Sequence, residues 1–284
     1  MTVIIKDKRV HFNGTAVPFM ESPFNSGLFK KQPKIVIIHY TFGASAKSSA
    51  EWWQDKKRNT GGSSAHVVID RDGSIIQCVP LDTIAWHAGD SKWQKDQTNL
   101  IGLNHYSFGI ELSNWGWLTP TNIGWKSLVG SPVPEAVIAN HRNGNPNNMA
   151  GPLGWEPFPE SQLNRAVELV RQLVHVFGVD EIIGHDDVSP GRKHDPGPAF
   201  DMHGFRQLVF GEGAGTNDGA FEVIAENGLN LRVGPAIDAK IIRLLPIGTR
   251  LEAIETVSNW MCVSVLDENG VPDQSGWVNR KYIR

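Results

Sequence analysis

The stretch Lys34-Ile-Val-Ile-Ile-His39 decides the fold that we expect for this chain. It is a short, mostly β-branched apolar run after Pro33, which is typical of a buried strand, and it ends in a histidine. A second run, Glu181-Ile-Ile183, leads into the polar loop 184–197. Because the ends of rigid strands can aim polar side chains into a cleft, the two runs predict a sheet with a functional site at one edge.

Three further strands are expected beside these runs. Residues 65–70 and 74–79 flank Arg71-Asp72-Gly73, which is a hairpin signal. Residues 106–112 form another apolar run. Strands that alternate with helices indicate an α/β domain with a mixed sheet.

Three helices are expected to flank the sheet. Ser48 and Glu51 have capping-box spacing, which predicts a helix through residues 51–57. Apolar residues recur at helical spacing from 163 to 177 and stop at Gly178. Asp201 is positioned to cap a last helix through residues 205–210.

The stretch 114–159 is rich in Pro, Gly, Asn and Trp, and its composition predicts a long loop. A loop of this length inside a compact domain is usually functional or mobile. Four of the ten tryptophans lie in it: Trp115, Trp117, Trp125 and Trp155.

A change of composition divides the chain. Residues 211–219 hold four glycines among small polar residues, which is typical of a linker. All ten histidines precede it. After it come short β-like runs separated by turn residues, which predict a small all-β barrel. We therefore expect an α/β domain over 1–210, a linker over 211–219 and a barrel over 220–284.

Composition excludes several classes of protein. The 284 residues carry 30 acidic and 27 basic side chains, a balance that gives no electrostatic case for binding nucleic acid. No apolar run reaches the roughly 18 residues of a membrane helix, and the N-terminus lacks the features of a signal peptide. Cys78 and Cys262 make no disulfide framework and are expected to be reduced, buried small hydrophobes.

The histidines at the two strand ends suggest a metal site. His39 and His185, with one carboxylate and an open fourth position, would make a catalytic zinc site. Pro196 favours an extended backbone at residue 195, which puts Lys193 and Asp195 on one face and turns His194 away. This favours Asp195 over His194 as the third ligand. A lysine beside the metal could stabilise a developing oxyanion.

With these residues in view, the first domain resembles the zinc-dependent N-acetylmuramoyl-L-alanine amidases of the amidase-2 family, which are related to the peptidoglycan recognition proteins. It is most similar to the anhydro-muropeptide branch. The matching blocks run in the family's order: Val36-Ile-Ile-His39, residues 64–77, Ala85-Trp-His-Ala-Gly89, Ser107-Phe-Gly-Ile-Glu-Leu112, and residues 184–200. The resemblance implies a mixed sheet flanked by helices, with the metal in a surface groove.

The resemblance also implies roles for individual residues. His39, His185 and Asp195 would bind Zn²⁺, and Glu111 and Lys193 would be catalytic. Trp86 and His87, in one of the matching blocks, would line the substrate groove. The implied reaction is hydrolysis of the amide between the lactyl group of N-acetylmuramic acid and L-alanine. The stretch 114–159 is longer than the minimal family pattern.

The tail resembles a bacterial SH3-like domain through Leu229-Asn-Leu-Arg-Val-Gly-Pro235 and Gly276-Trp-Val-Asn279. Such modules in lytic enzymes often bind cell walls. Four functions compete, the last of which is a structural or adaptor protein whose SH3-like tail recruits a partner. One is a prophage-type lysin that acts on intact wall and is released by a separate pore. The second is a cytoplasmic amidase that recycles anhydro-muropeptides. The third is a peptidoglycan-recognition module without catalysis. Because both catalytic positions and all three metal positions are filled, an enzyme is favoured.

Overall fold

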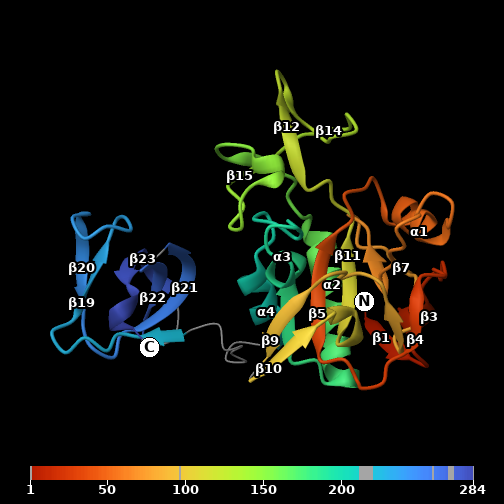
Figure 1. Ribbon diagram of the computed structural model, residues 1–284, viewed down its shortest axis with the longest axis horizontal. Coiled ribbons are helices and arrows are strands. Elements are labelled where there is room, and N and C mark those ends of the chain that lie inside the picture. The colour runs from red at the N-terminus through yellow and green to blue at the C-terminus, as the bar shows by residue number, and fades with distance from the viewer. Residues whose placement is uncertain (1, 96, 211–219, 258, 268–271, 284) are drawn as a thin grey trace. The chain divides into compact units, whose positions relative to one another are not determined.

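The computed structural model describes residues 2–95, 97–210, 220–257, 259–267 and 272–283, and the chain divides into two compact units, Met1–Glu212 and Gly213–Arg284 (Figure 1). The predicted linker 211–219 lies outside the described residues. No helix that these residues form is long and apolar enough to cross a membrane.

A five-stranded mixed sheet forms the centre of the first unit, in the order β17-β5-β11-β6-β7. The first four strands of this order run parallel, and the hairpin between β6 and β7 turns the last one around. The strands are β5 (Ile35–Tyr40), β6 (Val67–Ile69), β7 (Ile75–Gln77), β11 (Ser107–Leu112) and β17 (Glu181–Gly184). The predicted α/β mixed sheet is confirmed.

The two faces of this sheet are buried in different cores. Val36 and Ile38 of β5 belong to the larger core, which contains the apolar stripe of the long helix α2 (Glu160–Phe177). Ile35 and Ile37 belong to a smaller core. Successive side chains of a strand point to opposite faces. His39 therefore continues the row of Ile35 and Ile37 and lies on the face away from α2.

The helices end where the sequence provides caps, with one correction. Gly178 adopts the left-handed conformation (φ 63°) after α2, and Lys34 Nζ donates to the carbonyl oxygens of Phe177 and Gly178 at 3.0 and 3.1 Å. Asp201 Oδ1 accepts from Gly204 N at 2.9 Å, at the start of α4 (Met202–Phe210). However, α1 (Ala46–Gln54) begins earlier than predicted, because Ser45 and Ser48 form the capping box.

Several strands of the first unit were not predicted. β1 (Val3–Lys6), β2 (Arg9–Phe12) and β3 (Thr15–Ala16) form an antiparallel meander, whose Val3 and Val10 enter the larger core. Two pairs complete the set: β4 (Asn25–Leu28) with β8 (Thr83–Ala85), and β9 (Lys92–Lys95) with β10 (Thr98–Ile101).

The stretch 114–159 is not a long loop. It forms a second five-stranded sheet in the order β14-β13-β12-β16-β15, and its strands stand out from one end of the first unit in Figure 1. The strands are β12 (Trp117–Thr121), β13 (Gly124–Lys126), β14 (Pro132–Val133), β15 (Val137–Ala139) and β16 (Leu153–Trp155). The prediction was wrong because these strands are short and one contains Pro120. We call this sheet and its connections, residues 114–159, the insertion.

The second unit is an all-β domain, as predicted. It is a six-stranded antiparallel sheet in the order β18-β21-β22-β23-β19-β20. The strands are β18 (Ala220–Glu222), β19 (Leu229–Arg232), β20 (Ile241–Leu245), β21 (Arg250–Val257), β22 (Trp260–Leu266) and β23 (Pro272–Asn279). Strand β20 was missed.

The second unit also corrects one side-chain prediction. Met261, Val263 and Val265 of β22 fill its core. Cys262 alternates with them and is only half-buried, so its predicted burial was wrong. Cys78, in contrast, is fully buried, and burial raises the pKa of its thiol to about 12.

A candidate metal centre at the strand ends

The register of the central sheet brings the predicted site residues together. Glu111 on β11 pairs with His39 on β5, and the two strands run parallel. Gly184, the last residue of β17, pairs with Ile38, so His185 follows at the same sheet edge. Because parallel strands end at a common edge, three segments far apart in sequence deliver their side chains to one place.

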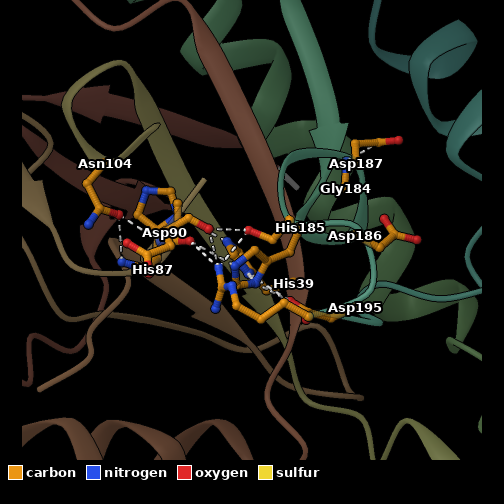
Figure 2. A network of polar contacts seen from close by, with 12 residues as sticks. His39, His87, Asp90, Asn104, Gly184, His185, Asp186, Asp187 and Asp195 are labelled. Atoms are coloured by element: carbon orange, nitrogen blue, oxygen red, sulfur yellow. Dashed lines mark hydrogen bonds and ion pairs between the residues drawn. The ribbon is translucent and has the colours of Figure 1, made fainter. Parts of the chain in front are cut away.

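His39, His185 and Asp195 point toward one another and form a tight triangle (Figure 2). His39 Nδ1 lies 2.9 Å from His185 Nδ1 and 2.8 Å from Asp195 Oδ2. His185 Nδ1 lies 2.9 Å from the same carboxylate oxygen. All three residues are buried, at 1%, 3% and 7% exposure. We call these three residues the ligand triangle.

The outer nitrogens of both imidazoles have partners. His185 Nε2 donates to the carbonyl oxygen of Ala88 at 3.1 Å. A carbonyl oxygen only accepts, so His185 Nε2 carries the proton and Nδ1 keeps its lone pair toward the triangle. His39 Nε2 lies 3.0 Å from His87 Nδ1. Such outer partners fix the orientation of metal-binding histidines.

Burial and neighbouring charges leave the triangle ready to bind a cation. Burial, reinforced by repulsion from His185, lowers the pKa of His39 to about 4, so its imidazole is neutral at neutral pH. Burial opposes the charge of Asp195, but His185 and His39 outweigh it and hold the pKa of Asp195 well below its usual value.

The donor set fits a transition metal. Two imidazole nitrogens and one carboxylate oxygen are a common set for catalytic zinc, which keeps a fourth position open. Among the residues that the structure describes, these three side chains are the only group whose ligand atoms converge in this way. His194 is outside that group: its ring packs against the ring of His141, with centroids 5.0 Å apart.

Glu111 reaches the same groove as the triangle and has an unusual environment. Its Oε2 is enclosed and has no hydrogen-bond partner among the described residues. Burial, followed by repulsion from Asp195, raises the pKa of Glu111 to about 8, although nearby Lys193 opposes the shift. A carboxyl group whose pKa lies near neutrality can both accept and donate a proton under physiological conditions.

The triangle opens into a groove of about 350 Å³. Lys193, Arg192 and His194 line it from the loop 184–197, and Trp53 and Trp52 line it from α1. Trp53 is buried and Trp52 is 43% exposed, so Trp53 is a core residue and Trp52 faces the groove.

Trp86 and His87 both line the groove but differ in setting. Trp86 is 37% exposed, and its Nε1 donates to Ser26 Oγ at 2.7 Å. His87 is 8% exposed and lies against His39. Gly109 makes room for it, since a Cβ there would lie 2.4 Å from His87 Cγ. The predicted substrate contacts of both residues stay predictions, and the contacts of His87 are those of a partner to His39.

Two functionally placed residues were missed. Phe42 lines the groove, is 38% exposed and has a positive φ of 56°, which is rare for a bulky residue. No sequence signal marks it. His141, which the sequence did not single out, is 4% exposed, and its Nε2 lies 3.1 Å from Asp186 Oδ2. It lies in a stretch rich in Pro and Gly, whose composition predicted a loop and gave no sign that this histidine is buried.

The fold and the triangle define a class: an α/β protein with a candidate mononuclear metal centre in a groove. Residues 29–198 match the N-acetylmuramoyl-L-alanine amidase family, and residues 227–284 match the bacterial SH3 domain. The chain belongs to the N-acetylmuramoyl-L-alanine amidase family.

Two named amidases are similar to part of this chain. The 1,6-anhydro-N-acetylmuramyl-L-alanine amidase AmpD of Escherichia coli (strain K12) is 34% identical over 146 residues, which are 51% of this chain and 58% of the relative. The N-acetylmuramoyl-L-alanine amidase AmiD of the same strain is 28% identical over 182 residues, 63% of this chain and 54% of that protein. The chain thus spans little more than half the length of these relatives. A crystal structure of a selenomethionine AmpD derivative has a TM-score of 0.46 at 24% identity, covering 68% of this chain and 94% of that one.

Proposed function

We propose that the first unit is a zinc-dependent amidase. It would hydrolyse the amide between the lactyl group of N-acetylmuramic acid and L-alanine, in peptidoglycan or in muropeptides. The ligand triangle carries this proposal, together with Glu111, whose enclosed Oε2 has no hydrogen-bond partner within the described part of the chain. Family membership and the names of the relatives support the choice of bond.

His39, His185 and Asp195 would hold the zinc ion. When bound, zinc supplies a Lewis acid that lowers the pKa of a coordinated water to about 7 and polarises a carbonyl group. The outer contacts of the two histidines, to His87 and to Ala88, would keep both Nδ1 atoms aimed at the ion.

Glu111 would move the proton. Its carboxylate would accept a proton from the attacking water and pass it to the leaving amine of L-alanine, which needs a group that is both acid and base near neutral pH. The raised pKa of Glu111, caused first by burial, suits this exchange. Lys193 would place its ammonium group near the carbonyl oxygen and stabilise the charge that develops there.

The assay that tests this function offers purified protein both intact sacculi and soluble anhydro-muropeptides, with zinc present. Release of stem peptides with a free L-alanine amine is the expected result. A rate that is higher on sacculi would favour the wall-lytic role of a prophage-type lysin, and a rate that is higher on anhydro-muropeptides would favour cytoplasmic recycling. The 1,6-anhydro group in the name of AmpD supports the second substrate. Binding of wall fragments with no release from either substrate would leave only a recognition module.

We further propose that the predicted division at 211–219 separates catalysis from wall binding, with the SH3-like unit holding the wall. A protein that ends at residue 210 should then keep its rate on soluble muropeptide and lose retention on sacculi. Retention equal to that of the full chain would exclude a targeting role for residues 220–284.

A further inference from the structure

Three residues of the insertion converge on Asp186, the residue directly after the ligand His185. His141 Nε2 lies 3.1 Å from Asp186 Oδ2. Arg142 donates through Nη2 to Oδ1 at 2.8 Å and through Nε to Oδ2 at 3.2 Å. Asn143 Nδ2 donates to the backbone oxygen of Asp186 at 2.8 Å. Both the carboxylate and the backbone of Asp186 are thus held from outside the central sheet.

These three residues stand on a well-braced loop. Asn143 N donates to His141 Nδ1 at 3.1 Å, so that nitrogen is an acceptor and Nε2 carries the proton that Asp186 accepts. Asn145 Oδ1 accepts from His141 N at 2.8 Å, and Asn145 Nδ2 donates to Gly151 O at 2.7 Å.

Asp186 in turn connects the two ligands of its loop. Its backbone N–H donates to the carbonyl oxygen of Asp195, nine positions further along the chain, at 2.8 Å. Figure 2 shows its carboxylate turned away from the ligand triangle, so it is no ligand itself. On the far side of Asp195, Trp155 of the insertion packs on Gly197, where a Cβ would lie 3.0 Å from the indole ring. The insertion therefore touches the ligand loop at both ends.

The contact between the insertion and Asp186 is buried, so its loss should cost free energy. Asp186 is only 3% exposed, and a buried carboxylate without partners is costly. Within the described residues, its side-chain partners are His141 and Arg142. Without the insertion, the Asp186 carboxylate would be more stable in contact with water. A shift of Asp186 toward solvent would also move the adjacent His185 and the backbone hydrogen bond to Asp195.

We infer that His141, Arg142 and Asn143 are positioning residues that hold the 185–195 segment in the geometry of a metal site. The inference rests on the proposed zinc site and assigns a purpose to the insertion, which the reaction itself does not use. His141 and Asn143 act through Asp186, and Arg142 acts through Asp186 and through Asp187, whose Oδ1 lies 2.6 Å from Arg142 Nη2. None of the three belongs to the ligand triangle.

Zinc affinity of the full chain, measured by competition with a chelator, tests the inference. Arg142→Gln and Asn143→Ala should each weaken zinc binding about 10-fold or more, the usual range for residues just outside the ligands. The Arg142 side chain is 55% exposed, so its replacement should fold. His141→Gln keeps a donor for Asp186 and should lose less affinity than His141→Ala.

Arg71→Gln is the matched control. Arg71 makes the same kind of paired contact, to Glu156 at 2.7 and 2.9 Å. It connects the insertion to the hairpin between β6 and β7 of the central sheet, away from the ligand loop. It should keep wild-type zinc affinity even if thermal unfolding of the metal-free protein shifts as much as in Arg142→Gln. Equal zinc affinity in Arg142→Gln and wild type, or equal losses in Arg142→Gln and Arg71→Gln, would overturn the inference. A wild-type chain that binds no zinc would instead refute the proposed metal site.

Discussion

The central sheet and the insertion both position the 185–195 segment, but they do so through different interactions. The sheet places His39, Glu111 and His185 through strand register, with apolar β-branched residues buried on both faces. The insertion has short strands and few buried aliphatic residues, and it holds Asp186 through hydrogen bonds and an ion pair. The difference shows that apolar packing positions the strand ends that carry His39 and His185. Polar contacts, in contrast, hold the loop that carries Asp195.

The largest effect should come from a ligand that the sheet supplies. His39→Ala removes one corner of the ligand triangle, and zinc binding should fall beyond the roughly 100-fold that changes outside the ligands cost. Metal analysis after dialysis measures the loss of zinc, and the muropeptide assay measures the accompanying loss of turnover. His175→Ala, on the exposed side of α2, is the control. Full zinc content in His39→Ala would mean that the sheet edge is not the metal site.

The next largest effect separates chemistry from metal binding at the same sheet edge. Glu111→Gln should lower kcat by about 10²- to 10⁴-fold, the usual contribution of a general acid–base, and leave zinc content unchanged. Glu168→Gln on α2 removes a carboxylate that pairs with Arg165 outside the groove and should turn over normally. Normal turnover in Glu111→Gln would remove this residue from the mechanism.

A smaller effect concerns the stability of the metal-free protein. The folded-state pKa of Glu111, raised by burial to about 8, exceeds the ordinary value of 4.5. The folded state therefore binds more protons than the unfolded state between these values, and its stability should fall as pH rises through this window. Relative to Glu111→Gln, the wild type should lose roughly 3 kcal/mol between about pH 5 and pH 8, at about 1.4 kcal/mol per unit. Urea unfolding of both proteins in chelator measures the difference, and parallel pH curves would contradict it.

The smallest effect is expected at the tip of the insertion. Ile123 is 97% exposed, in the turn between β12 and β13, and Ile123→Ser should change the free energy of unfolding by less than about 0.5 kcal/mol. Zinc affinity should equal that of the wild type. A loss of zinc affinity from this tip would show that the insertion acts on the site as a whole and not through residues 141–143.

The parts that the sequence could predict are those with local, repetitive signals. β5 and β17 are short β-branched runs, and α2 has a clear apolar stripe with Gly178 after it. His39 and His185 followed from strand ends, and Asp195 from the constraint of Pro196. Glu111 came only through family resemblance, because one glutamate near a strand end has no distinguishing pattern.

The parts that escaped prediction depend on contacts distant in sequence, with one exception. No local signal shows that His141 meets Asp186, 45 residues away, or that Trp155 packs on Gly197. The exception is the N-terminal meander. Asn13-Gly14, with positive φ angles of 49° and 81°, is a strong hairpin signal between β2 and β3 and could have revealed it.

Phe42 has a consequence for anyone who selects this protein for heat resistance. Its left-handed backbone costs of order 1 kcal/mol or more, and glycine would adopt it freely. Its ring meets Trp117 of the insertion, at a centroid distance of 6.2 Å, and faces the groove. Against this gain, Phe42→Gly loses the packing of a ring that is only 38% exposed and adds the backbone entropy of glycine to the unfolded state. A screen for melting temperature alone registers only this balance and not the loss of the aromatic wall of the groove. Substrate turnover belongs in such a selection from its first round.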